Sequence, residues 1–180
     1  MIYMFLAEGF EEVEAIATLD VIRRAGIEID TVGIGNKIIT GSHSVSVVCD
    51  KTDSEVVLDD CLNGIILPGG MPGTTNLLNS SVVNSAIDYC SEKGLLISAI
   101  CAAPMILGRK GLLNNKNAIC FPGFEDELKG ATVSEDFVCT DGNIITAKGM
   151  GSAVNFGLAV VSYFTDYESA EKLKGTLQCS

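Results

Sequence analysis

Short apolar segments alternate along the chain with longer stretches in which apolar residues recur at helical spacing. The apolar segments have the length of β-strands and lie at 2–7, 29–34, 64–68, 95–100 and 118–121, with hairpin-like pairs at 38–48 and 137–147. Helical periodicity occupies 11–25, 80–94, 102–107 and a last stretch around 154–161. Strands that are apolar throughout and are followed by helices are typical of a parallel sheet covered on both faces. The pattern therefore predicts an α/β fold with a mostly parallel sheet and helices on both faces.

The first periodic stretch carries the signals of a complete helix. Ala15, Leu19 and Ile22 follow the spacing i, i+4, i+7, so they share one face. Glutamates occupy the first turn, arginines occupy the last, and Gly26 follows. This order suits the helix dipole and a glycine cap, and it predicts a helix from 11 to 25.

Length and composition limit the organisation of the chain. The 180 residues suffice for one domain of about 150 residues and are short for two. Apolar residues make up 47% of the chain, which excludes a disordered protein. We expect a single domain over 1–180, in which the polar segment 166–180 forms a surface tail with a short helix.

The charge is strongly negative, with 12 basic and 23 acidic residues giving a net charge of −11. Such a surface repels phosphate backbones and anionic lipids, so we expect no nucleic-acid or membrane partner. The apolar N-terminal run lacks a basic flank, and no later run reaches the ~20 apolar residues that span a bilayer. These features predict a cytoplasmic protein.

The seven cysteines include no C-x-x-C pair. In a protein without an export signal they are expected to be reduced thiols, most of them buried as small apolar residues. Nucleotide loops are absent as well: 69–73 lacks the Lys-Ser/Thr of a P-loop, and Gly149-Met150-Gly151 has Val154 where a third glycine is required. We therefore expect no cofactor.

One cysteine lies where chemistry is expected. Cys101 stands between the buried strand 95–100 and the helix that follows, with small residues on both sides, which is the location of a nucleophile elbow. The free N–H groups of Ala102 and Ala103 and the helix dipole favour an anion there, so the pKa of the thiol is expected to fall. The alternative is that Cys101 is one more buried thiol, in an α/β module that merely binds a metabolite.

Three glutamates cluster after the first strand. Glu11 and Glu12 fit a solvated first helical turn, whereas Glu14 lies three residues from Glu11 and can face the same cleft. A carboxyl group beside a thiolate is tolerated when the two share a proton, and burial favours the protonated acid. Glu14 is therefore the candidate acid/base.

Four segments together resemble the ThiJ/PfpI superfamily, and within it the DJ-one branch. They are Gly9-Phe10-Glu11-Glu12-Val13-Glu14, Leu67-Pro68-Gly69-Gly70, Ala99-Ile100-Cys101-Ala102-Ala103-Pro104 and Gly149-Met150-Gly151-Ser152. Their order and spacing match from residue 1 to about 165. The combination is specific, although each segment alone is not.

The resemblance implies a flavodoxin-like, doubly wound fold and a homodimer. It implies that Cys101 is the nucleophile, that Glu14 is its protonated partner, and that the N–H groups of Gly70 and Ala102 bind an oxyanion or a cysteine sulfinate. The implied activity is that of a glutathione-independent glyoxalase or deglycase, which acts on small reactive aldehydes or their early protein adducts. The alternative is an oxidative-stress sensor or redox-regulated chaperone in which Cys101 is oxidised to the sulfinate.

The histidine content departs from the family pattern. Many members place a histidine before a proline after the strand that follows the elbow helix, where this chain has Phe121-Pro122. A conventional Cys-His dyad is therefore not expected. The single histidine, His43, is expected on the surface of the early hairpin, or to reach Cys101 from a dimer partner. We expect no metal site, because no second ligand stands at a recognisable spacing from His43.

Overall fold

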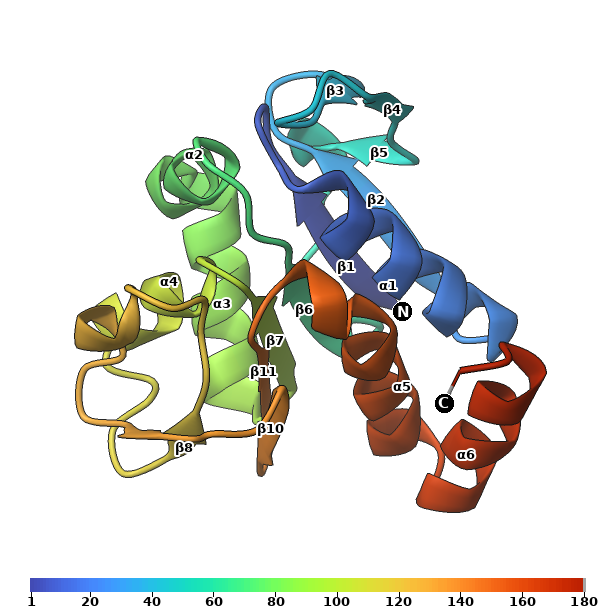
Figure 1. Cartoon of the computed structure of the whole chain (residues 1–180). Helices are drawn as coiled ribbons and strands as arrows, with labels where there is room; N and C mark the ends of the chain where they lie inside the picture. The colour runs from blue at the N-terminus through green and yellow to red at the C-terminus, as the bar shows by residue number, and fades with distance from the viewer. Residues whose placement is uncertain (180) are drawn as a thin grey trace.

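The computed structural model of the chain describes residues 1–179 and is built on a seven-stranded sheet (Figure 1). In spatial order the strands are β10 (Val138–Asp141), β11 (Ile144–Ala147), β7 (Leu96–Ile100), β6 (Gly64–Leu67), β1 (Ile2–Leu6), β2 (Ile29–Gly33) and β5 (Lys51–Thr52). Neighbouring strands are parallel, except for the antiparallel pair β10 and β11. The mostly parallel sheet predicted from the apolar runs is confirmed.

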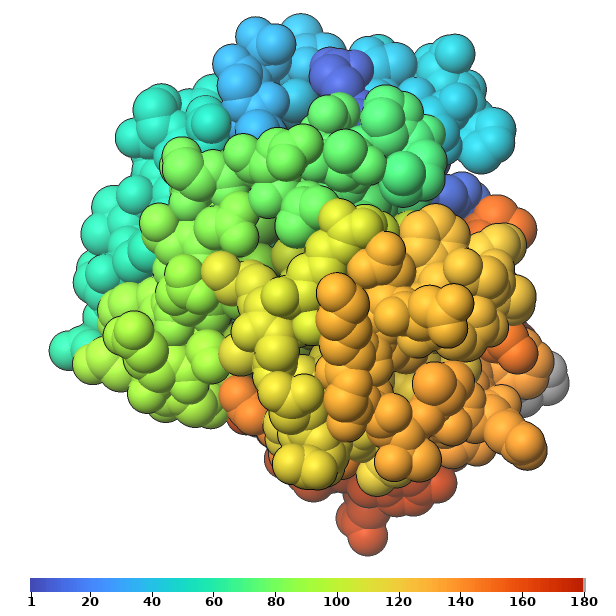
Figure 2. Space-filling view, turned by 90° about the vertical axis from the view of Figure 1, so that its left-hand side faces the viewer, coloured from blue at the N-terminus to red at the C-terminus, as the bar shows by residue number. Residues whose placement is uncertain are grey.

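Helices cover both faces of this sheet (Figure 1). They are α1 (Glu12–Arg24), α2 (Gly73–Asn79), α3 (Ser81–Lys93), α4 (Pro104–Arg109), α5 (Ala153–Phe164) and α6 (Tyr167–Thr176). The helices α1 and α5 lie on one face, and α2, α3 and α4 lie on the other. Figure 2 shows this second side, where α2 and α3 in green adjoin the yellow and orange segment that follows α4.

The alternation of side chains along β1 divides the core in two. Ile2, Met4 and Leu6 pack in a cluster with apolar residues of α1 and α5. Tyr3 and Phe5 point to the opposite face and pack in a cluster with residues of α3 and α4. Every residue of β1 is buried, as expected for a central strand of a doubly covered sheet.

Two small sheets and three short 3₁₀ helices complete the described chain. The strands β3 (Ile38–Thr40) and β4 (Ser46–Val48) form the antiparallel hairpin that the sequence predicts. The strands β8 (Asn117–Ala118) and β9 (Thr132–Val133) pair in parallel. The 3₁₀ helices are η1 (Asp53–Glu55), η2 (Glu125–Glu127) and η3 (Met150–Ser152).

Four local features of the structure were not expected from the sequence. The helix α2 and the edge strand β5 were not predicted, because a seven-residue helix and a two-residue strand carry too few periodic positions to be recognised. The apolar run 118–121 forms only the end of β8, outside the central sheet. The polar tail is fastened to the body, since Ala170 of α6 is buried in the cluster that contains α5. Residue 180 of the predicted domain and tail lies outside the described residues.

No helix within residues 1–179 combines the length and the apolar character needed to cross a bilayer.

Candidate functional site

Cys101 occupies the bend between β7 and α4. Its φ of 65° is in the left-handed region, which residues other than glycine rarely adopt. The N–H of Cys101 donates to the carbonyl of Ala147 at 2.9 Å, and its own carbonyl accepts from Phe121 N–H at 2.8 Å. The neighbouring strand and the following loop therefore hold the bend, and they leave the Cys101 side chain half-buried. This is the geometry of the predicted elbow.

Glu14 extends from the first turn of α1 to the same place. Its side chain is buried, and its Oε2 accepts a hydrogen bond from Gly69 N–H at 2.9 Å. A Cβ atom at Gly69 would lie 2.6 Å from both Cys101 Cβ and Glu14 Oε2. A glycine is therefore required at position 69 for the thiol and the carboxyl group to approach each other.

Two backbone donors are directed at the sulfur. The N–H groups of Ala102 and Gly70 lower the pKa of the Cys101 thiol and so favour its thiolate. Gly70 adopts a φ of 89°, which aims its N–H into the site. The helix α4 is only six residues long, so these two N–H groups, and not a helix dipole, are the local positive charge.

Burial sets the acidity of the pair. It raises the pKa of Glu14 to about 7, and the negative charge of Glu11 adds to this effect. Burial and the nearby Glu14 carboxylate also raise the pKa of the Cys101 thiol to about 12. The thiol pKa that the sequence predicts to be lowered is therefore raised while Glu14 is ionised, because desolvation and a like charge outweigh the two N–H donors.

The two groups consequently titrate as one unit. The first proton leaves the pair near pH 7, and above that pH a single proton remains to be shared. A thiol beside a carboxylate, and a thiolate beside a carboxylic acid, contain the same number of protons. Glu14 is thus suited to take the thiol proton during attack and to return it later, because its pKa lies near the working pH.

One oxygen of Glu14 supports this shared proton. Within residues 1–179, the buried Oε1 has no partner of good hydrogen-bond geometry. A buried, unpaired polar atom costs about 1–3 kcal/mol. Protonation of the carboxyl group would remove the charge from this buried, unpaired oxygen, so the site favours a carboxyl group that can hold a proton.

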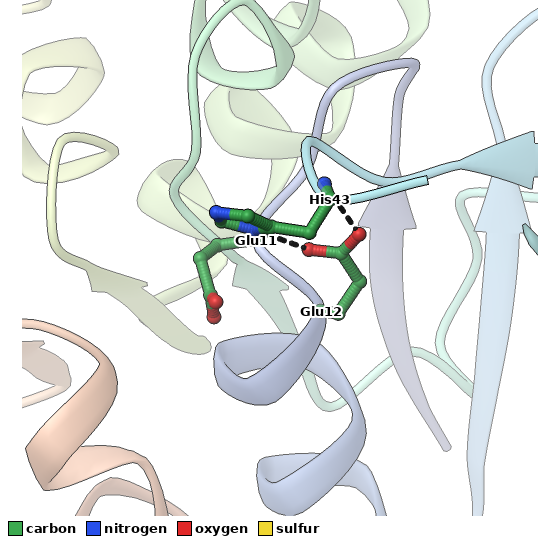
Figure 3. A group of neighbouring side chains, drawn as sticks. All are labelled: Glu11, Glu12 and His43. Carbon is green, nitrogen blue, oxygen red and sulfur yellow. Dashed lines mark hydrogen bonds and ion pairs between the residues drawn. The ribbon is translucent and has the colours of Figure 1, made fainter. Parts of the chain in front are cut away.

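Glu12 fastens the β3–β4 hairpin to α1 (Figure 3). Its Oε1 accepts from His43 N–H at 2.7 Å and Val45 N–H at 3.3 Å, and its Oε2 lies 3.1 Å from His43 Nδ1 and accepts from Ser42 Oγ at 3.4 Å. Burial opposes ionisation of Glu12, but these partners prevail and hold its pKa below the ordinary value. Glu12 is therefore a buried anchor and not the solvated residue that was predicted.

His43 is exposed, as the sequence predicts, with 76% of its side chain accessible. Although no second ligand stands near His43 in the sequence, the fold brings donor atoms of Glu11, Glu12 and His43 within 4.8 Å of one another (Figure 3). These three side chains could offer a cation two carboxylates and an imidazole. The oxygens of Glu12 already accept hydrogen bonds from the hairpin, so they are satisfied as acceptors without a cation.

Phe121 stands beside the elbow where an imidazole was considered. Its N–H bonds the Cys101 carbonyl, and its side chain is 47% exposed. The sequence analysis does not identify a further neighbour, the N–H of Met150, which lowers the pKa of the Glu14 carboxyl group. The segment Gly149–Ser152 had been noted only as a motif, and nothing in its residue types indicates that contact.

The geometry can be compared with known proteins. The sequence model described as the DJ-1/PfpI family matches residues 1–163. Protein dj-1beta of Drosophila melanogaster is 33% identical over 178 residues, which cover 97% of this chain and 95% of that protein. Protein DJ-1 homolog B of Arabidopsis thaliana is 33% identical over 175 residues, or 96% of this chain, but the matched region is only 40% of that longer protein.

Solved structures agree with these matches. Oxidised Toxoplasma gondii DJ-1 superposes with a TM-score of 0.94 at 31% identity, and the alignment covers 99% of this chain and 98% of the other. Drosophila melanogaster DJ-1beta superposes with a TM-score of 0.92 at 30% identity, over 99% and 97% of the two chains. The fold is thus shared over nearly the whole chain.

Proposed function

The chain belongs to the DJ-1/PfpI family, as its motifs indicated, and on that premise we propose that it acts through Cys101 on small reactive aldehydes or on their early adducts with proteins. The observation that carries the proposal is the convergence of four groups. The Cys101 thiol, the Glu14 carboxyl group and the N–H groups of Gly70 and Ala102 meet at one half-buried bend.

With a 2-oxoaldehyde such as methylglyoxal, Cys101 Sγ would bond to the aldehyde carbon as Glu14 takes the thiol proton. The carbonyl oxygen becomes a hydroxyl by accepting that proton, which gives a hemithioacetal. Glu14 then moves the proton of the former aldehyde carbon to the neighbouring ketone carbon, while the proton of the hemithioacetal hydroxyl passes to the ketone oxygen. The first carbon is thereby oxidised to a thioester and the second is reduced to an alcohol. Water cleaves the resulting thioester and releases lactate and the free thiol.

The two backbone donors have a separate part in this scheme. The N–H groups of Gly70 and Ala102 would stabilise negative charge on the carbonyl oxygen as the sulfur attacks. Donors of this kind typically contribute about 3–4 kcal/mol each. An aldehyde suits the site because addition of the thiol expels no leaving group. No imidazole is then needed to protonate one, and position 121 is a phenylalanine.

The experiment is lactate formation from methylglyoxal in the absence of glutathione. We expect Cys101→Ser to lower kcat/KM at least a hundredfold, because the hydroxyl is a far weaker nucleophile. The matched control is Cys61→Ser, which removes an exposed thiol elsewhere. Undiminished turnover by Cys101→Ser would overturn the proposal.

The same donors favour a second candidate, an oxidation sensor. Two N–H groups directed at Sγ would also bind the oxygens of a cysteine sulfinate, and the similar Toxoplasma gondii protein has been solved in an oxidised form. Titration with peroxide, followed by intact-mass measurement, distinguishes the two functions. A selective gain of two oxygens on Cys101, without turnover of aldehyde, would favour the sensor.

We further propose that the protein is a cytoplasmic homodimer. Exposed apolar side chains support self-association, since Val13 and Ile16 of α1 are 46% and 39% accessible. They lie three residues apart and therefore on one helical face.

A further inference from the structure

A hollow of about 340 Å³ lies beside the elbow. Its walls are Phe121, Pro122, Phe137, Lys148 and the segment Gly149–Ser152. Three large apolar side chains at this hollow are exposed: Phe121 by 47%, Phe137 by 65% and Met150 by 54%. Gathered apolar side chains of this kind mark binding sites on otherwise polar proteins, and the volume is within the range of small-molecule pockets.

The hollow and the reactive pair share a wall. Phe121 N–H donates to the carbonyl of Cys101 at 2.8 Å, and the N–H of Met150 lies close enough to the Glu14 carboxyl group to lower its pKa. Gly149 lies between them: a Cβ atom there would stand 3.2 Å from the Phe121 ring and 4.0 Å from Glu14 Oε1. The hollow therefore adjoins the segments that carry Cys101 and Glu14.

The residues that line the hollow determine which chemical group it can bind. Two phenyl rings, a proline and a thioether provide flat and flexible apolar surface. The one charged side chain of the lining is Lys148, whose Nζ lies 5.5 Å from the centre of the Phe137 ring. Its ammonium group is thus engaged by an aromatic face, which leaves the hollow suited to a hydrocarbon group and above all to an aromatic ring.

We propose that this hollow binds the aryl substituent of the electrophile that Cys101 attacks, so that Phe121 and Phe137 determine specificity for aryl over methyl 2-oxoaldehydes. The inference rests on the proposed function and narrows its substrate class. A methyl group would leave the hollow empty, whereas a phenyl group would remove both its own surface and the exposed rings from water. A difference of a few apolar carbons in such a pocket changes rates on the order of tenfold or more.

The test compares two alkylating agents with the same reacting carbon, iodoacetamide and 2-iodo-N-phenylacetamide. The second-order rate constants for modification of Cys101 are measured by mass spectrometry. The ratio of the rate constant with 2-iodo-N-phenylacetamide to that with iodoacetamide is then compared among variants. We expect Phe137→Ala and Phe121→Ala to lower this ratio roughly tenfold. The matched control is Tyr167→Ala, which removes an aromatic side chain 71% exposed on α6 and should leave the ratio unchanged.

Turnover of phenylglyoxal relative to methylglyoxal is measured in parallel. One outcome is that neither aldehyde is converted while the alkylation ratio falls in the phenylalanine variants. It would contradict the proposed aldehyde function and support the hollow as an aryl-binding site. If both aldehydes are converted and neither ratio responds to the variants, the hollow is not a substrate site. A change of oligomeric state in Phe137→Ala, with both ratios unchanged, would assign the hollow to an interface between copies and would also overturn the proposal.

Discussion

At the scale of single residues, the chemistry depends on Glu14 more than on the bend that presents Cys101. The N–H groups of Gly70 and Ala102 favour the thiolate, but burial and the neighbouring carboxylate raise the pKa of the thiol to about 12. The proton that leaves near pH 7 belongs to the pair, because burial raises the pKa of Glu14 to about 7. We therefore expect Glu14 to determine the pH at which the sulfur becomes reactive.

This dependence predicts the pH profile of Cys101 alkylation. With Glu14 present, loss of one proton from the pair activates the sulfur, so the rate with iodoacetamide should rise through a midpoint near pH 7. In Glu14→Gln the thiol ionises alone and buried, so the midpoint should move above the ordinary thiol value of about 8.5. The rate at pH 7 should then fall by about tenfold or more.

Modification of the exposed Cys61, followed in the same samples, checks that the reagent and the fold are intact. A wild-type rate that keeps rising beyond pH 10, with no midpoint near 7, would show that the two groups do not share a proton.

At the scale of elements, the strongest patterns in the sequence were the most informative. The apolar run that forms β1 and the periodic stretch that forms α1 could be predicted because burial on both faces of a strand, or on one face of a helix, fixes residue type at every position. The helix α2 and the contact between Glu12 and the hairpin could not be predicted from the sequence. The first is too short to show a period, and the second joins residues 31 positions apart in the chain.

The same limit applies to the candidate site. Cys101 and Glu14 could be selected by their places after strands, and the structure brings them together. Their acidity could not be predicted, because it depends on how far each group is removed from water. The exposed Phe121 and Phe137 lie in separate loops, so the hollow that they line has no counterpart in any local pattern.

Contact between α1 and α5 leads to a prediction about packing. A Cβ atom at Gly157 of α5 would lie 2.9 Å from Val21 Cβ, so the helices approach too closely for a side chain. We expect Gly157→Leu to lower the free energy of unfolding by about 1–3 kcal/mol or more, measured by urea denaturation. Gly175→Ala in α6 is the control, because open space surrounds that position and alanine favours a helix. Equal stability of the two variants would contradict this account of the packing.

At the scale of the whole molecule, charge and apolar surface oppose each other. A net charge of −11 makes copies of the chain repel one another. The exposed Val13 and Ile16 favour association, and salt should assist it by screening the repulsion. Self-association through α1 would remove these side chains from water.

Sedimentation velocity tests this expectation. We predict a dimer for the wild-type protein, strengthened by added salt, and a shift to monomer in Ile16→Glu. Val133→Glu places the same charge at a similarly exposed position, 42% accessible on β9, and should remain dimeric. If both variants dissociate alike, the effect is one of charge and not of the α1 surface.

The attachment of the hairpin by Glu12 has a consequence for the kinetics of ligand binding. Glu12 joins the hairpin to the start of α1, and Glu11 N–H bonds the carbonyl of Gly69 at 3.0 Å, so three separate segments are tied together at the rim. A molecule that reaches Cys101 would therefore meet a rim that is already assembled, and no loop would have to fold over it. Little conformational entropy is then lost on binding, and the association rate should be set by diffusion and by the accessibility of the site.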